Sequence, residues 1–165
     1  MNQSNEYAFF DAGMFIGALN RGDPRFMEAY PMVEAARRGD LAACTSTGIL
    51  SEVYAALTWV GAAPPHSPAT AAQAIARIIE PPSNIRVLPD GLDAALLHLQ
   101  LAKRHNLTAR RIHAARRAAT ALHHQVRSIY TYDLGDWRDF IVDGIVIVGP
   151  PSTLARLPSP LARDL

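Results

Sequence analysis

Short apolar runs alternate along this chain with stretches in which apolar residues recur every three or four positions. This alternation is typical of a parallel sheet covered by helices. The apolar runs predict five strands, at residues 7–10, 41–44, 85–88, 129–132 and 145–148. The periodic stretches predict helices at residues 14–19, 25–38, 49–57, 92–105 and 109–124, and one ending near residue 79. The expected fold is a three-layer α/β/α sandwich with a mainly parallel central sheet.

Several residues mark where these elements begin and end. Gly39 is expected to end the helix at 25–38, because glycine suits the left-handed conformation that follows many helices. Ser67 or Thr70 can cap the helix ending near residue 79, and Thr108 the helix at 109–124. The elements stop at Pro150. We therefore expect one domain over residues 1–150 and a loosely attached, Pro-rich tail over residues 151–165.

Composition narrows the class of protein. Of the 165 residues, 49% are hydrophobic and 19% charged, which favours a folded chain over a disordered one. The net charge of +1 does not by itself indicate a nucleic-acid partner. The single cysteine, Cys44, excludes an intrachain disulfide and a thiolate metal cluster. Residues 1–6 lack signal-peptide features and no apolar run is long enough for a membrane span, so we expect a cytoplasmic protein without membrane contact.

Carboxylates follow several of the apolar runs. Asp11 ends the first strand, Asp133 ends the fourth with Asp136 three positions later, and Glu52 follows a run of small residues at residues 44–48. Ligands gather at the carboxyl ends of parallel strands, and a buried acid is costly unless it holds a cation. Oxygen ligands suit Mg²⁺ or Mn²⁺, which activates water and stabilises charge on a phosphate. The pattern thus predicts a metal site for phosphodiester hydrolysis.

Other roles for these acids remain open. Asp11 can simply cap the helix that follows it, Glu52 can be a solvated helix residue, and Asp136 can belong to a turn. Taken together, Asp11, Glu52 and Asp133 favour the metal role. A phosphotransferase with Asp11 as nucleophile would need a second aspartate at position 13, which is Gly13. The chain also lacks the glycine spacing of a phosphate-binding loop.

Four short segments form a recognisable set: FDAGMFI at residues 10–16, LSEV at 50–53, AATAL at 118–122 and YTYDLGDW at 130–137. Together they resemble the PIN-domain ribonucleases, in particular the VapC-type toxins of bacterial type II toxin–antitoxin pairs. Their order and spacing cover about residues 7–148. The resemblance implies a small α/β/α domain, Mg²⁺- or Mn²⁺-dependent cleavage of RNA, a homodimer, and neutralisation by a small antitoxin protein.

The resemblance also implies roles for individual residues. Asp11, Glu52 and Asp133 would be metal-binding catalytic acids, Asp136 an auxiliary acid, and Thr131 a hydroxyl beside the site.

The family's remaining acid falls on Ala114, and a methyl group can neither bind metal nor orient water. Either the natural gene has lost this acid or it was replaced to disable the toxin, and the intact surroundings favour replacement. We expect an impaired endoribonuclease, with a catalytically weak module that binds RNA or antitoxin as the alternative.

Two surface features suggest partners. A basic helix beside the expected site carries four arginines that can hold RNA phosphates, although a solvated helix face explains them equally well. They are Arg110, Arg111, Arg116 and Arg117. Trp59, beside a Pro-rich stretch, is a candidate contact for a second protein.

Overall fold

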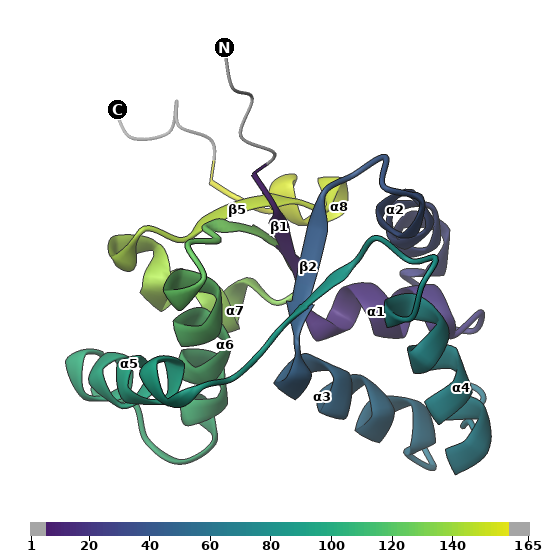
Figure 1. The fold of residues 1–165 in the computed structure, drawn as a ribbon, viewed down its shortest axis with the longest axis horizontal. Helices are drawn as coiled ribbons and strands as arrows, with labels where there is room; N and C mark the ends of the chain where they lie inside the picture. Colours follow the sequence, from purple (N-terminus) through teal and green to yellow (C-terminus); the bar gives the residue numbers. More distant parts are fainter. Residues whose placement is uncertain (1–5, 159–165) are drawn as a thin grey trace.

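The structure is a computed structural model that describes residues 6–158. Five short strands form one sheet in the order β3-β2-β1-β4-β5, and every neighbouring pair is parallel (Figure 1). The strands are β1 (Ala8–Phe10), β2 (Ala43–Ser46), β3 (Arg86–Leu88), β4 (Ser128–Tyr130) and β5 (Val146–Gly149). The predicted parallel sheet is confirmed.

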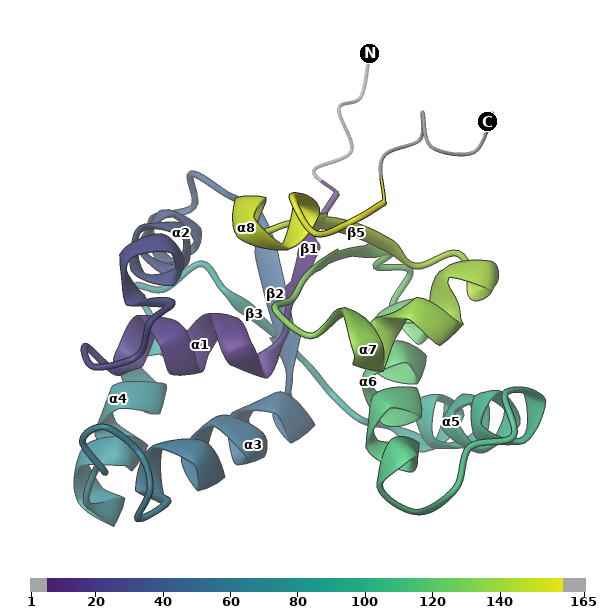
Figure 2. The same cartoon turned by 180° about the vertical axis from the view of Figure 1, so that it is seen from behind.

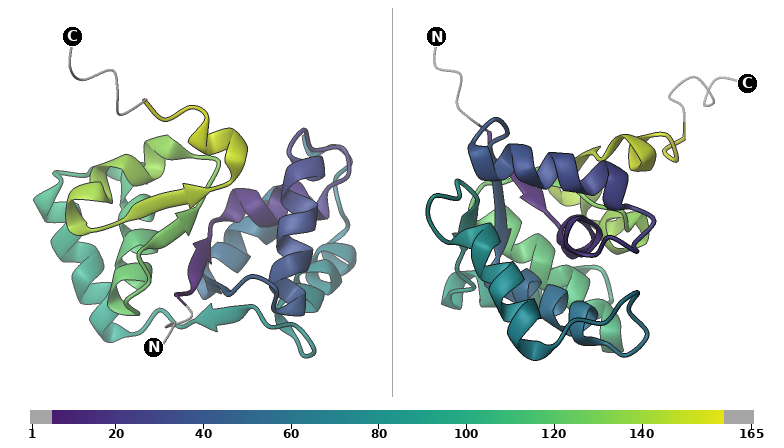
Figure 3. Two further views of the ribbon diagram at one scale, coloured as in Figure 1. Left: turned by 90° about the horizontal axis from the view of Figure 1, so that it is seen from above. Right: turned by 90° about the vertical axis from the view of Figure 1, so that its right-hand side faces the viewer.

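Helices cover both faces of this sheet. They are α1 (Ala12–Leu19), α2 (Phe26–Arg38), α3 (Thr47–Thr58), α4 (Pro68–Ile79), α5 (Leu92–Arg104), α6 (Ile112–His123), α7 (Leu134–Trp137) and α8 (Pro151–Leu154), with 3₁₀ turns η1 (Ala109–Arg111) and η2 (Arg138–Asp143). Seen from above, α1 to α4 lie on one side of the sheet and α5 to α7 on the other, which confirms the three layers (Figure 3). Within residues 6–158, no helix has the length and apolar character needed to cross a membrane.

The order of the strands creates a switch point beside β1. The chain moves outward from β1 to β2 and β3, and then returns to place β4 on the other side of β1. At such a point the connections leave the sheet in opposite directions, so the carboxyl ends of β1 and β4 border a natural ligand site. Asp11 follows β1, and Thr131 follows β4. The topology therefore places these two side chains together.

The central strand is buried on both faces, as expected in a parallel sheet. Phe9 and Phe10 are both fully buried. The Phe9 ring packs edge-on against Trp137, with 5.7 Å between ring centroids, and Phe10 packs against Tyr130 at 5.1 Å. These contacts tie β1 to β4 and α7 and hold the end of β1 in place.

Some boundaries differ from the sequence prediction. Gly39 ends α2 in the left-handed conformation, with φ of 87°, as expected. Strand β2 lies two residues later than predicted, because Thr45 and Ser46 are buried in the sheet: Thr45 Oγ1 donates to the Phe10 carbonyl, and Ser46 caps α3. Strand β4 ends at Tyr130, so the residues after it form a loop. Thr108 precedes η1 but makes no side-chain capping bond there.

The segment after Pro150 begins with the short helix α8. Glu28 of α2 accepts hydrogen bonds from the Ser152 backbone N–H at 2.9 Å and from Ser152 Oγ at 2.6 Å. The start of the predicted tail is thus attached to the domain. Residues 159–165 of that tail lie outside the described part of the chain, and the division at residue 150 remains a prediction.

We predict that the packing of η2 into the hydrophobic core contributes strongly to stability. Phe140→Ala removes a side chain that is 1% exposed and should lower the free energy of unfolding by about 3–5 kcal/mol. Val142→Ala, at an 82% exposed position in the same turn, should change it by less than about 0.5 kcal/mol. Urea unfolding of both variants gives the comparison, and similar losses in the two would contradict this packing.

Candidate functional site

The carboxylate of Asp11 is buried at the end of β1 and is held by three donors. The Ala12 backbone N–H donates to Oδ1 at 2.9 Å, which makes Asp11 the cap of α1. Thr131 Oγ1 and Trp137 Nε1 both donate to Oδ2, at 2.7 and 2.8 Å. Asp11 is therefore both a helix cap and the centre of a hydrogen-bonded site, so the two roles weighed from the sequence coexist.

A guanidinium group from α6 lies among the acids. Arg117 donates from Nε and Nη2 to the two carboxylate oxygens of Glu52, at 3.1 and 2.6 Å, and from Nη1 to Asp136 Oδ2 at 2.6 Å. Its Nε is also 3.9 Å from Asp11 Oδ1. Only 14% of the Arg117 side chain is exposed. The acid cluster, defined here as Asp11, Glu52 and Asp136, thus contains a cation supplied by the chain itself.

The pKa of Arg117 reflects this position. Burial acts to lower the pKa, because it penalises the charged form. The negative charge of Asp11, together with the hydrogen bonds and charges of Glu52 and Asp136, outweighs burial and raises the pKa above its usual value. Arg117 is a permanent positive charge in this cluster.

Asp133 lies at the edge of the cluster and makes a different kind of contact. Its Oδ1 accepts the backbone N–H of Asp136 at 3.1 Å, and so caps α7. Its own backbone N–H donates to Thr131 Oγ1 at 3.0 Å. Thr131 therefore joins the Asp133 loop to Asp11. A cavity of about 150 Å³ lies beside these groups and is lined by residues that include Asp11, Asp133, Asp136, Thr131 and Arg117. Glu52 is not among the lining residues but is bonded to one of them, Arg117.

The site residues come from elements that meet around the ends of β1 and β4. In Figure 2, α1 and α3 face α6 and α7 across this part of the molecule. Asp11 precedes α1, Glu52 lies on α3, Arg117 on α6 and Asp136 on α7. The expected convergence of acids from separate elements is thus observed, although Arg117 joins three of them and Asp133 stands apart.

The arrangement does not fit a metal ion. Carboxylate oxygens are the donors that Mg²⁺ prefers. In the part of the chain that the structure describes, however, no three carboxylate, imidazole or thiol side chains are grouped closely enough to hold one. Glu52 and Asp136 direct their oxygens at Arg117, and both oxygens of Asp11 accept hydrogen bonds from the protein. The carboxylate oxygens are of the type that binds a hard cation, but they are arranged around the guanidinium of Arg117.

Ala114 lies on the helix face that is turned toward the acids. It belongs to the first turn of α6, which begins at Ile112 and not at the predicted residue 109, and its side chain is buried. Arg117 follows three positions later, and residues three apart share one helix face. The acid that the resemblance leads one to expect at position 114 would therefore sit one turn from Arg117.

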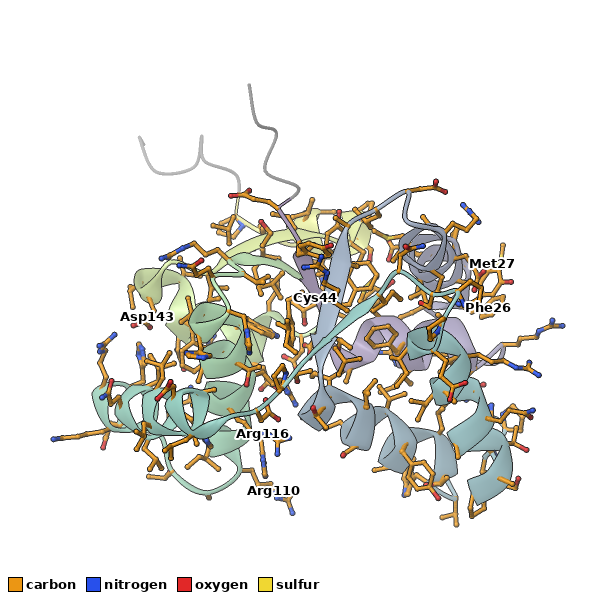
Figure 4. The ribbon with its side chains drawn as sticks, in the orientation of Figure 1. Phe26, Met27, Cys44, Arg110, Arg116 and Asp143 are labelled. Atoms are coloured by element: carbon orange, nitrogen blue, oxygen red, sulfur yellow. The ribbon has the colours of Figure 1, made fainter. Side chains whose placement is uncertain are left out.

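The four arginines of the basic helix have different surroundings. Arg117 points into the acid cluster and not toward a phosphate-binding surface, and Arg111 forms an ion pair with Asp139. Arg116 lies 3.5 Å from Glu52 and so close to Gly48 that a Cβ there would be 2.7 Å from its Nη2. Figure 4 shows Arg110 and Arg116 projecting near each other beside the start of α3. The exposed Arg110 is thus open to an anionic partner, whereas Arg116 would have to leave Glu52 to reach one.

Two aromatic residues near the site were not singled out from the sequence. Trp137 supplies the donor to Asp11, and only the four-residue spacing from Asp133 hints at this. Tyr132 donates its hydroxyl to Glu28 at 2.9 Å, and Arg25 lies over its ring at 5.4 Å from the centroid. Burial and the acceptor Glu28 raise the pKa of Tyr132 above its usual range, so the phenol stays protonated. Tyr132 thereby ties the site loop to α2.

Comparisons with known proteins show the family and the fold of the chain. The PIN domain family matches residues 8–139. VapC20 of Mycobacterium tuberculosis, described as a toxin that cleaves the sarcin–ricin loop, superposes with a TM-score of 0.65 at 22% identity, over 87% of this chain and 99% of that one. A chain of a toxin–antitoxin complex from Klebsiella pneumoniae gives 0.55 at 22% identity, over 85% and 96%. No curated protein sequence matches the chain. At this identity the two likenesses concern the fold.

The two tryptophans allow a test of the Asp11 contact. Trp137→Phe keeps much of the buried ring but leaves Asp11 Oδ2 without one donor, so the free energy of unfolding should fall by about 1.5–3 kcal/mol. Trp59→Phe, at a position that is 64% exposed, should cost less than about 0.5 kcal/mol. Chemical unfolding followed by circular dichroism measures both. A smaller loss at position 137 than at position 59 would show that the hydrogen bond does not stabilise the buried carboxylate.

Proposed function

Because the chain belongs to the PIN domain family, we propose that it is a metal-dependent endoribonuclease toxin of the VapC type, held at low activity in this sequence. The observation that carries the proposal is the meeting of Asp11, Glu52 and Asp136 at the switch point of the sheet, with Asp133 beside them. Acids from three separate parts of the chain, the end of β1, α3 and the start of α7, have no structural need to converge, and their mutual repulsion is costly. A site that hydrolyses a phosphodiester would account for this convergence.

The proposed cofactor is Mg²⁺ or Mn²⁺. PIN domains are generally metal-dependent, and an all-oxygen donor set selects these ions. Asp11, Glu52 and Asp133 are the proposed ligands, with Asp136 as an auxiliary acid and Thr131 as the hydroxyl that positions Asp11. In the arrangement described, Arg117 occupies the acids, so we assign no catalytic step to the ion.

RNA is the proposed substrate. Arg110 is exposed, and the half-buried Arg116 lies 3.5 Å from Glu52 of the acid cluster. In the view of Figure 4 both side chains project beside the start of α3. Phosphate contacts of this kind supply most of the affinity for RNA without selecting its sequence. The two arginines would hold the backbone on either side of a scissile phosphate.

A second candidate function is a catalytically weak PIN domain that binds RNA or an antitoxin. Two observations favour it: position 114 carries a methyl group, and Arg117 places a positive charge among the acids. Both reduce the negative potential that would attract a metal ion. Binding through the exposed Arg110 would be unaffected by either.

An antitoxin and a second copy of the chain are the proposed protein partners. One structural neighbour was solved as a toxin–antitoxin complex. A pocket of about 520 Å³ lies between α1 and α3 and is lined by Ile16, Arg25, Ala56 and Trp59 among others. Trp59 is 64% exposed, and large exposed aromatic side chains are typical of binding hot spots. We assign this pocket to an antitoxin side chain.

Cleavage of total cellular RNA tests the enzyme hypothesis. With Mn²⁺ present, Ala114→Asp should cleave at least about tenfold faster than the unchanged chain, because it restores an oxygen that can bind the ion or orient water. Chelator should abolish the activity of both proteins, and adding Asp11→Asn to the variant should do the same.

Aspartate has the lower helix propensity, so a stability loss of about 0.5 kcal/mol is expected and does not count against the idea. Equal cleavage by the two proteins, or none by either, would favour the binding module.

A further inference from the structure

We propose that Arg117 is a built-in counter-ion: it takes the place of the divalent cation, so the acid cluster is complete without metal and binds metal only when the guanidinium has left. The inference rests on the proposed function and deepens it by assigning a cause to the low activity proposed above. Its test measures metal binding and thermal stability and not cleavage. The counter-ion proposal can therefore fail while the nuclease proposal stands, and the nuclease proposal can fail while the counter-ion proposal stands.

The contacts of Arg117 use the acids in the way a metal would. Glu52 is held by both of its oxygens in a fork, and Asp136 is held by one. A guanidinium is planar and permanently charged, and matches a carboxylate with two parallel N–H bonds. Glu52 and Asp136 thereby direct oxygens at one group, and Asp11 Oδ1 lies 3.9 Å from it. A metal ion would have to compete for the same oxygens.

Asp11 leaves little room for a competing ion. Its Oδ2 accepts two hydrogen bonds, from Thr131 and Trp137, and its Oδ1 accepts one from Ala12. Arg117 Nε lies 3.9 Å from the same Oδ1. Metal binding by Asp11 therefore requires either the loss of a protein hydrogen bond or the departure of Arg117.

Charge bookkeeping explains why the arginine is stable there. Three buried or half-buried carboxylates without a cation would repel one another, and removing one partner from a buried ion pair is strongly destabilising. Arg117 supplies one positive charge inside the cluster, and Arg116 adds another at 3.5 Å from Glu52. Because the pKa of Arg117 is raised, it cannot leave by losing its proton. Only displacement by another cation, or movement of the side chain, frees the acids.

The test replaces Arg117 with an uncharged residue of similar length. Arg117→Met should lower the melting temperature in chelator by roughly 5 °C or more, because the acids lose their counter-ion. Millimolar Mn²⁺ should restore most of that loss. The unchanged protein should melt at the same temperature with Mn²⁺ and with chelator.

A matched control separates this effect from the loss of any arginine. Arg38 is exposed and forms an ion pair with Asp40. It is the last residue of α2, whereas Tyr132 of the site loop contacts Glu28 in the first turn of that helix. Arg38→Met should change the melting temperature little, and Mn²⁺ should not shift it.

Titration calorimetry with Mn²⁺ completes the test. Arg117→Met should bind Mn²⁺ at least about tenfold more tightly than the unchanged chain, and Asp11→Asn added to it should remove that gain. Arg117→Lys keeps the charge but cannot hold Glu52 and Asp136 together, so its affinity should fall between the two. This variant also decides the matter if Arg117→Met does not fold. Mn²⁺ affinities that are equal in the unchanged chain and in the Arg117 variants that fold would overturn the proposal.

Discussion

The buried carboxylate of Asp11 is the group on which the rest of the site depends. It ends the central strand, caps α1 on one face of the sheet, and accepts hydrogen bonds from Thr131 and Trp137 on the other side. Burying a carboxylate costs several kcal/mol unless donors replace its water. Each of these donors comes from a different segment, so satisfying this one charge fixes how the end of β1, the loop after β4 and α7 meet.

Electrostatic balance then determines what the site can hold. The donors around Asp11 do not bond to the side chains of Glu52 and Asp136, so these two carboxylates need a separate cationic partner. Arg117 is long enough to reach both, and its planar group fits them at hydrogen-bonding distance. At position 114, one turn earlier, a methyl group adds no negative charge. The cluster therefore has fewer acids to attract a metal ion and one internal cation that competes with it.

Much of this arrangement follows from the sequence. Apolar periodicity predicts the strands and helices, and the rule that parallel strands end at one edge predicts that Asp11 and the Asp133 loop meet. Strand β2 was misplaced because Thr45 and Ser46 are polar, yet their hydroxyls are satisfied within the sheet and at a helix cap. The sequence suggests Arg117 as a residue that can hold RNA phosphates, but its side chain turns into the acid cluster. Helical spacing assigns it a face but does not tell whether a long side chain turns to acids or to solvent.

The permanent charge of Arg117 limits how such a site could be opened. A histidine in its place would release the acids as the pH rises, because it loses its charge near neutrality. Arginine keeps its charge, so pH within the physiological range cannot free the carboxylates through this side chain. Opening must instead come from a competitor, either a cation that displaces the guanidinium or an anion that draws it out. A phosphate group of RNA is such an anion, and the cavity beside Arg117 is lined by Asp133 and Asp136, which disfavour an anion there. Displacement by a cation is therefore the easier route. The strength of the contacts between Arg117 and the acids sets the cation concentration that displacement requires.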